Sequence, residues 1–154
     1  MKTRIGLKGL LIITLRDRKG RIKKQIKKRN VITNVGKAQV AGLINGLVTS
    51  PFVYIAFGSG TTPASETDTA LEAEIARKAG SVSRETTNVT NDTAVIETTF
   101  SSADGLTGTS DVSEAGLFDD PTAGNMLARQ TFTAFTVNWD QGDTLTITWK
   151  ITVS

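Results

Sequence analysis

The sequence predicts a mainly β protein, an antiparallel β-sandwich or barrel of seven to eight strands with one medium and one short helix. Residues 144–154 alternate apolar and polar side chains without a miss, as in a strand with one buried face. Most of the preceding stretches are short, rich in β-branched residues and separated by Gly, Asn or Asp turn signals. The 154 residues suffice for one domain with its own core, and the lack of cysteine excludes a disulfide scaffold.

The first predicted element is a β-hairpin. Residues 7–16 are apolar and β-branched, which predicts a strand buried on both faces or lying in an interface. Residues 17–20 (Asp-Arg-Lys-Gly) are typical of a tight turn, and residues 21–29 return as a second strand. An amphipathic helix over residues 21–29 is the alternative, and Gly20 argues against it.

A medium helix follows the hairpin. Thr33 or Asn34 is a suitable N-cap, and residues 35–47 carry the helical pattern, weakened in the last turn by Asn45-Gly46. We expect its apolar stripe to face the core; the stripe consists of Val35, Val40, Leu43, Ile44 and Leu47.

A short aromatic strand at residues 52–57 ends in Gly58-Ser59-Gly60. This glycine pair resembles a phosphate-binding loop, but the Gly-Lys-Ser/Thr ending and the following apolar helix are missing. We interpret residues 58–60 as the exit from a strand.

The second half of the chain predicts one short helix and then strands. The short helix spans residues 70–77 and is capped by Asp68 or Thr69. Strands are expected at residues 81–89, 94–100, 111–118 and 126–137, and at the alternating C-terminal stretch. The predicted core anchors are large aromatic residues on these strands: Phe52, Tyr54, Phe118, Phe132 and Trp149.

Charge is distributed unevenly along the chain. Residues 1–30 contain twelve Lys or Arg and a single acidic residue, whereas the remainder contains six basic and fourteen acidic residues. The sequence therefore predicts a basic N-terminal arm or hairpin over residues 1–32, joined to a β-sandwich body over residues 33–154 within a single domain. Removal of residues 1–30 is expected to leave the body folded.

The residue types that are missing limit the chemistry. Without His or Cys, the chain lacks the commonest general base, the thiol nucleophile and the usual zinc ligands. Glu114, Asp119 and Asp120, with Asp104 and Asp111 nearby, could gather around calcium, but their spacing is not that of an EF-hand. We expect no enzyme activity, no metal and no cofactor.

Two further absences concern the cell compartment. No apolar run is long enough to span a bilayer, so no membrane contact is expected. The N-terminus resembles a signal peptide but lacks a small-residue cleavage site, which indicates a protein used without export.

The basic residues at the hairpin have three interpretations. They could contact an acidic protein surface, protect an edge strand from aggregation, or bind nucleic acid. No aromatic residue lies in the first fifty positions to stack on bases, so nucleic acid is the least favoured partner. The predicted contact residues are Arg16, Arg18, Lys19, Arg21, Lys23, Lys24, Lys27, Lys28 and Arg29.

Six segments in order resemble a widespread family of tailed-phage virion structural proteins, often described as capsid-decoration or tail-fibre proteins. The segments are residues 30–47, 54–60, 67–75, 113–119, 126–132 and 143–153. The resemblance implies a β-sandwich or β-tulip-like barrel, no catalysis and assembly as an oligomer, often a trimer. The strongly basic N-terminus departs from the more neutral versions expected in such proteins.

The resulting hypothesis is a capsid decoration protein. It would be made in the host cytoplasm and bind the outer surface of the virion head as a homotrimer, contacting the major capsid protein lattice and no small-molecule substrate. A tail-tip or tail-fibre-base module is the first alternative, and a nucleic-acid-binding protein using residues 21–29 is the second.

Overall fold

The computed structural model describes residues 4–154, and the first three residues of the predicted arm lie outside this range. The described chain is mainly β, as predicted, and forms a single nearly closed antiparallel sheet of nine strands. The elements are β1 (Leu7–Arg16), β2 (Ile22–Ile32), α1 (Asn34–Asn45), β3 (Tyr54–Gly58), β4 (Glu74–Ala79), β5 (Ser81–Glu85), β6 (Thr93–Phe100), the 3-10 turn η1 (Ser102–Asp104), β7 (Thr109–Phe118), β8 (Met126–Asn138) and β9 (Thr144–Val153).

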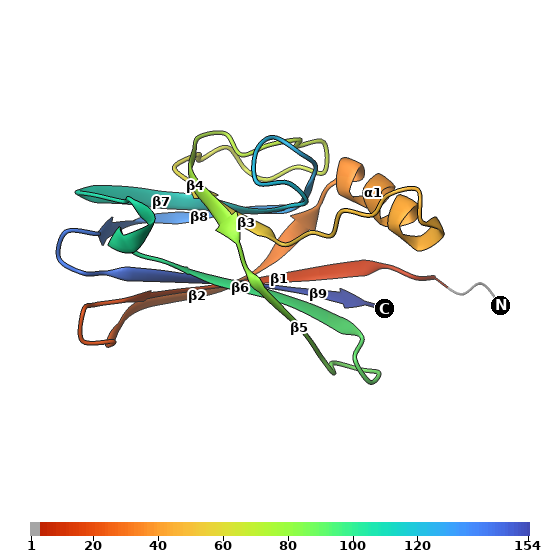
Figure 1. Ribbon diagram of the computed structural model, residues 1–154, viewed down its shortest axis with the longest axis horizontal. Helices are drawn as coiled ribbons and strands as arrows, with labels where there is room; N and C mark the ends of the chain where they lie inside the picture. Colours follow the sequence, from red (N-terminus) through yellow and green to blue (C-terminus); the bar gives the residue numbers. More distant parts are fainter. Residues whose placement is uncertain (1–3) are drawn as a thin grey trace.

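The sheet folds over into two layers (Figure 1). The strand order is β4-β3-β7-β8-β2-β1-β9-β6-β5, so the first four strands form one layer and the last five form the other. The layers meet on one side where β4 passes through Gly80 directly into β5. A side chain on Gly80 would lie 2.8 Å from the Glu97 carbonyl oxygen, so glycine allows this close turn. On the other side the layers meet where β2 pairs briefly with β8.

The core lies between the layers. Its largest fully buried side chains include Trp139, Trp149, Phe57 and Phe100, whereas the buried Phe118 belongs to a separate small cluster with Ala56, Leu71 and Met126. The Phe57 and Phe100 rings meet edge to face, with centroids 4.8 Å apart. Of the other predicted anchors, Phe52 is buried, whereas Tyr54 and Phe132 are partly buried. Trp139, Phe57 and Phe100 were not among the predicted anchors.

The N-terminal hairpin is an integral part of the barrel. The turn forms as predicted, with Gly20 at φ +80° and its N–H donating to the Asp17 carbonyl at 2.9 Å. However, β1 pairs with β2 on one side and with β9 on the other, and its Leu11, Ile13 and Leu15 side chains are buried in the core. Residues 33–154 therefore cannot keep this core without β1, contrary to the expectation from sequence.

The predicted short helix at residues 70–77 is wrong. Leu71 is buried, but the N–H groups of Glu72 and Ala73 donate to the Glu114 carboxylate instead of forming helical bonds. Residues from Glu74 onward then pair with β3 as strand β4. This strand makes the total nine, one more than the upper limit of the prediction.

Helix α1 begins and ends as the sequence predicts, within two residues. The Thr33 hydroxyl accepts from Gly36 N–H at 2.9 Å, and Gly46 ends the helix in the left-handed conformation. The expected core-facing stripe is correct only in part. Val40 and Leu43 pack against the core, but Ile44 and Leu47 are 83% and 84% exposed because the helix lies against β8 at the end of the barrel.

Candidate functional site

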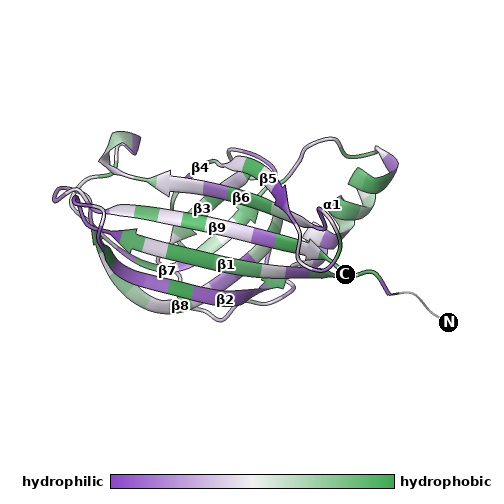
Figure 2. Cartoon of the chain, turned by 90° about the horizontal axis from the view of Figure 1, so that it is seen from below, coloured by the Kyte–Doolittle hydropathy of each residue, from purple (hydrophilic) through white to green (hydrophobic). Residues whose placement is uncertain are grey.

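The basic residues predicted from sequence lie together on the β1–β2 hairpin. β2 is exposed along most of its length and is the hydrophilic neighbour of the more apolar β1 (Figure 2). Because side chains alternate along a strand, the basic residues of β2 are divided between its two sides. Lys27 and Arg29 pair with Ile12 and Leu10 on the outer face of the sheet, whereas Lys24 and Lys28 lie on the side that faces β8.

Two of these cations are used within the molecule. Arg21 Nε donates to Asp17 at 2.8 Å, which stabilises the hairpin turn. Lys23 Nζ donates to Asp143 at 2.7 Å, and this buried carboxylate also accepts from Asn138 N–H at 2.9 Å. These two residues therefore fix the end of the barrel at which the hairpin turn meets the β8–β9 turn.

The other predicted contact residues form no ion pair with an acidic side chain of the described chain. Lys24 Nζ lies 5.9 Å from the centroid of the Phe135 ring, and Lys28 Nζ donates to the Thr131 carbonyl at 2.8 Å. Within residues 4–154 no ion pair engages the five remaining cations. These are Arg16, Arg18, Lys19, Lys27 and Arg29. The hairpin therefore offers a band of positive charge to an anionic partner.

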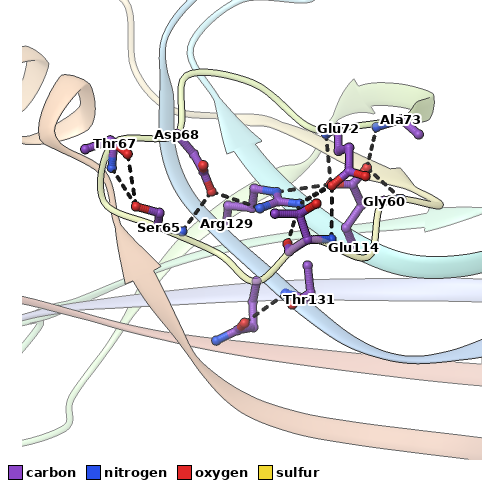
Figure 3. Close-up of polar contacts among 11 residues, drawn as sticks. Gly60, Ser65, Thr67, Asp68, Glu72, Ala73, Glu114, Arg129 and Thr131 are labelled. Atoms are coloured by element: carbon purple, nitrogen blue, oxygen red, sulfur yellow. Dashed lines mark hydrogen bonds and ion pairs between the residues drawn. The ribbon is translucent and has the colours of Figure 1, made fainter.

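A buried ion pair that was not predicted from sequence joins β7 and β8, in the layer formed by β4, β3, β7 and β8 (Figure 3). Glu114 of β7 is completely buried, and Arg129 of β8 is 2% exposed. Arg129 Nη2 donates to Glu114 at 2.9 Å, and its Nη1 donates to Asp68 at 2.8 Å. The signal in the sequence is a single charged residue in each of two otherwise uncharged strand segments, at residues 112–118 and 126–129.

The Glu114 carboxylate holds the long loop between β3 and β4. It accepts from the N–H groups of Gly60, Glu72 and Ala73 at 3.0, 3.1 and 2.7 Å. Burial acts to lower the pKa of Arg129, but hydrogen bonds to Asp68 and Glu114 outweigh it and raise that pKa above its ordinary value. The hydrogen-bonding capacity of both groups is largely used, which is the arrangement of a structural ion pair.

The same carboxylate explains the Gly58-Ser59-Gly60 segment. A Cβ on Gly60 would lie 2.6 Å from Glu114 Cδ, and one on Gly58 would lie 2.6 Å from Glu114 Oε1. The two glycines therefore let the chain approach a buried carboxylate closely.

The acidic residues considered for calcium are separated by the fold. Asp104 binds Lys78 at 2.9 Å, Asp111 accepts from Thr136 at 2.7 Å, and Asp119 accepts from Asn125 N–H at 2.7 Å. Within residues 4–154 no three acidic side chains are grouped closely enough to hold a metal ion.

A second surface lies at the helix end of the barrel, beside the C-terminal end of β9 (Figure 1). We call it the apolar patch; it is a shallow groove with exposed apolar rims. Ile5 and Val153 are 78% and 50% exposed on one side, and Ile44 of α1 is exposed on the other. The groove is lined by Ile5, Gly6, Leu7, Ile32, Lys37, Val40, Ala41, Ile44 and Val153. Apolar residues concentrated in this way are typical of a contact surface.

No protein-family model matches this chain, and no curated protein is significantly similar to it in sequence. Within the described residues, no helix is both long and apolar enough to cross a membrane.

Proposed function

We propose that this protein is a non-catalytic structural component of a tailed-phage virion, a decoration protein that binds the outer surface of the capsid as a homotrimer. The proposal starts from the ordered resemblance of six sequence segments to such proteins. It is supported by the mainly β fold, which suits a rigid module that presents fixed surfaces. Within this proposal, β2 contacts the capsid lattice and the apolar patch contacts other copies.

The observation that carries the proposal is the exposed basic strand β2. Within seven residues, β2 carries Lys24, Lys27, Lys28 and Arg29, which form no ion pair in the described chain, and Lys23, which is paired with Asp143. An acidic lattice would attract this side of the protein and orient it. Each contact is weak alone, but a trimer that engages three lattice sites gains affinity from the high local concentration.

The apolar patch supports self-association. The rims formed by Ile5, Ile44 and Val153 carry no charge, and Lys37, which also lines the groove, has its Nζ 3.5 Å from Glu66 Oε2. In a closed symmetric oligomer each copy contributes the same elements to every contact, so apolar rims can bury one another without charge repulsion. β2 could not do this, because two copies of it would bring lysines together.

The main cluster of buried charged side chains is already hydrogen-bonded within the protein, which favours a structural role. The Glu114 carboxylate accepts five hydrogen bonds from Gly60, Glu72, Ala73 and Arg129. A carboxylate that accepts five hydrogen bonds within the protein has little hydrogen-bonding capacity left for a substrate.

The test is attachment of the purified protein to particles of the phage that encodes it. The variant Arg29→Glu should lose most attachment, whereas Arg84→Glu, which makes the same charge change at an exposed arginine of β5, should retain it. Gold label on this protein in negative-stain images should cover the head. Label confined to the tail tip would contradict the decoration role and favour a tail module.

A further inference from the structure

The barrel has an incomplete seam between β2 and β8. In the described chain these strands pair only at Val31↔Arg129 and Ile32↔Ala128. One residue pair further toward the hairpin turn, side-chain hydrogen bonds take the place of backbone pairing. Gln130 Nε2 donates to the Arg29 carbonyl at 2.6 Å, and Lys28 Nζ donates to the Thr131 carbonyl at 2.8 Å. Beyond this point the two strands belong to separate layers that draw apart toward the hairpin turn (Figure 1).

The backbone groups that face the seam can be assigned by their alternation along β2. Thr33 N–H donates to the Leu127 carbonyl, and the Arg29 carbonyl accepts from Gln130, so these odd-numbered positions face β8. Backbone N–H and C=O groups of alternate residues point to the same side of a strand. The N–H and C=O groups of Lys27 and Gln25 therefore face the seam, and within residues 4–154 no strand pairs with them there.

The inner side of the seam is apolar at its centre, between Lys24, whose Nζ lies 5.9 Å from the Phe135 ring centroid, and Lys28, whose Nζ donates to the Thr131 carbonyl. Ile26 of β2 and Phe132 and Phe135 of β8 are partly buried and pack against the core. The two rings stack with centroids 5.8 Å apart. A strand laid along the free edge of β2 would thus place alternate side chains over these rings, and the others on the outer face opposite Lys27 and Arg29.

The charges identify the occupant. A second copy of β2 would repel the first, and the sheet-edge strand β4 (EIARKA) carries more basic than acidic residues. We infer that β2 accepts an acidic, extended segment of a different protein, which adds as a strand beside Gln25 and Lys27. This segment alternates apolar residues, which cover Phe132 and Phe135, with Asp or Glu, which meet Lys27 and Arg29.

This inference deepens the proposed function, because it gives the chemistry by which β2 recognises its protein partner. The assay below uses the free protein and a peptide in solution. Peptide binding and attachment to particles can therefore succeed or fail separately.

The probe is a fluorescein-labelled peptide of sequence Thr-Glu-Val-Glu-Val-Glu-Thr. Its matched control has proline in place of both valines, which keeps the charge but prevents strand pairing. At physiological salt we expect the proline peptide to bind at least about tenfold more weakly in fluorescence anisotropy. Equal affinities would overturn the inference, as would a short DNA duplex that binds more tightly than the valine peptide.

A pair of variants isolates the backbone of β2. Gln25→Pro removes one seam-facing N–H and leaves the ladder to β1 in place, whereas Gln25→Ala removes only the side chain and its 3.1 Å bond to Thr14. The proline variant should lose about tenfold or more in peptide affinity, and the alanine variant should keep it. Retained affinity in a folded proline variant would contradict strand addition.

Hydrogen exchange on the unmodified protein gives a readout that does not depend on folding of the variant. The amides of Gln25 and Lys27 should gain protection when the valine peptide binds. The intervening amide of Ile26 already faces β1 and should change little. Unchanged exchange at both seam-facing amides, under saturating peptide, would overturn the inference.

Discussion

Arg129 lies diagonally across the β7–β8 ladder from Glu114, and its Nε and Nη2 atoms donate to the same carboxylate oxygen at 3.0 and 2.9 Å. The pair is enclosed by the barrel and by the loop between β3 and β4. It therefore links the position of that loop to the packing of two central strands.

Replacing Glu114 by glutamine should destabilise the fold strongly. The Glu114→Gln variant keeps the size of the side chain but leaves Arg129 buried with only part of its compensating charge. We expect a loss of about 3–5 kcal/mol in the free energy of unfolding, measured by urea denaturation. Glu97→Gln, on the exposed outer face, is the control and should cost no more than about 0.5 kcal/mol. Similar losses for the two variants would show that the buried pair is not structural.

The close approach at Gly60 predicts a steric effect. A methyl group there would lie 2.6 Å from Glu114 Cδ and from Glu72 Cβ, so Gly60→Ala forces the loop away from the carboxylate. The expected cost is about 1–3 kcal/mol. Ser59→Ala tests an exposed neighbour and should be nearly neutral in the same thermal or chemical unfolding measurement. A fully stable Gly60→Ala protein would contradict the geometry described for this loop.

The apolar patch predicts the oligomeric state. Ile44→Glu places a charge where copies of the chain are proposed to meet, and should shift the protein toward monomer in sedimentation velocity. Val89→Glu introduces the same charge at another exposed apolar residue, 69% exposed in the β5–β6 loop, and should leave the oligomer intact. If the unmodified protein sediments as a monomer at micromolar concentration, the patch does not mediate self-association.

The β5–β6 loop predicts a response to acid. Asp92 accepts from the N–H groups of Val89, Thr87 and Asn88, each at 2.8 Å, and these bonds lower its pKa to about 2. A lowered pKa means that the ionised carboxylate stabilises the loop at neutral pH, and that this contribution is lost as the pH falls from about 4 to about 2.

Carbon-detected NMR of the Asp92 carboxyl group should show its midpoint near pH 2. Asp92→Asn should abolish this part of the acid sensitivity. A midpoint at the ordinary value of 3.8 would mean that the three N–H groups do not hold the carboxylate in solution.

The elements predicted correctly from sequence are those whose signals are local. The alternation in residues 144–154 indicated β9, the turn before Arg21 indicated the hairpin, and Thr33 and Gly46 indicated the ends of α1. Each of these signals is an alternation of side-chain polarity, a turn sequence or a helix cap. Such a signal lies entirely within a short stretch of the sequence.

The errors arise where distant residues decide the structure. Residues 70–77 form no helix because Glu114, some forty positions away, takes the N–H groups of Glu72 and Ala73. Ile44 is exposed because α1 covers only the end of the barrel. The seam beside β2 was also not predicted, because a run of lysines does not reveal which strand lies on its far side.

The passage of β4 through Gly80 into β5 has a mechanical consequence. On that side β4 and β5 are separated only by Gly80, so one short stretch of chain serves both layers, whereas the opposite side depends on two residue pairs and a few side-chain bonds. Slow breathing of the barrel should therefore be a hinge motion about the Gly80 corner, with β2 and β8 moving apart. A small molecule or strand that bridges them would stiffen the entire barrel.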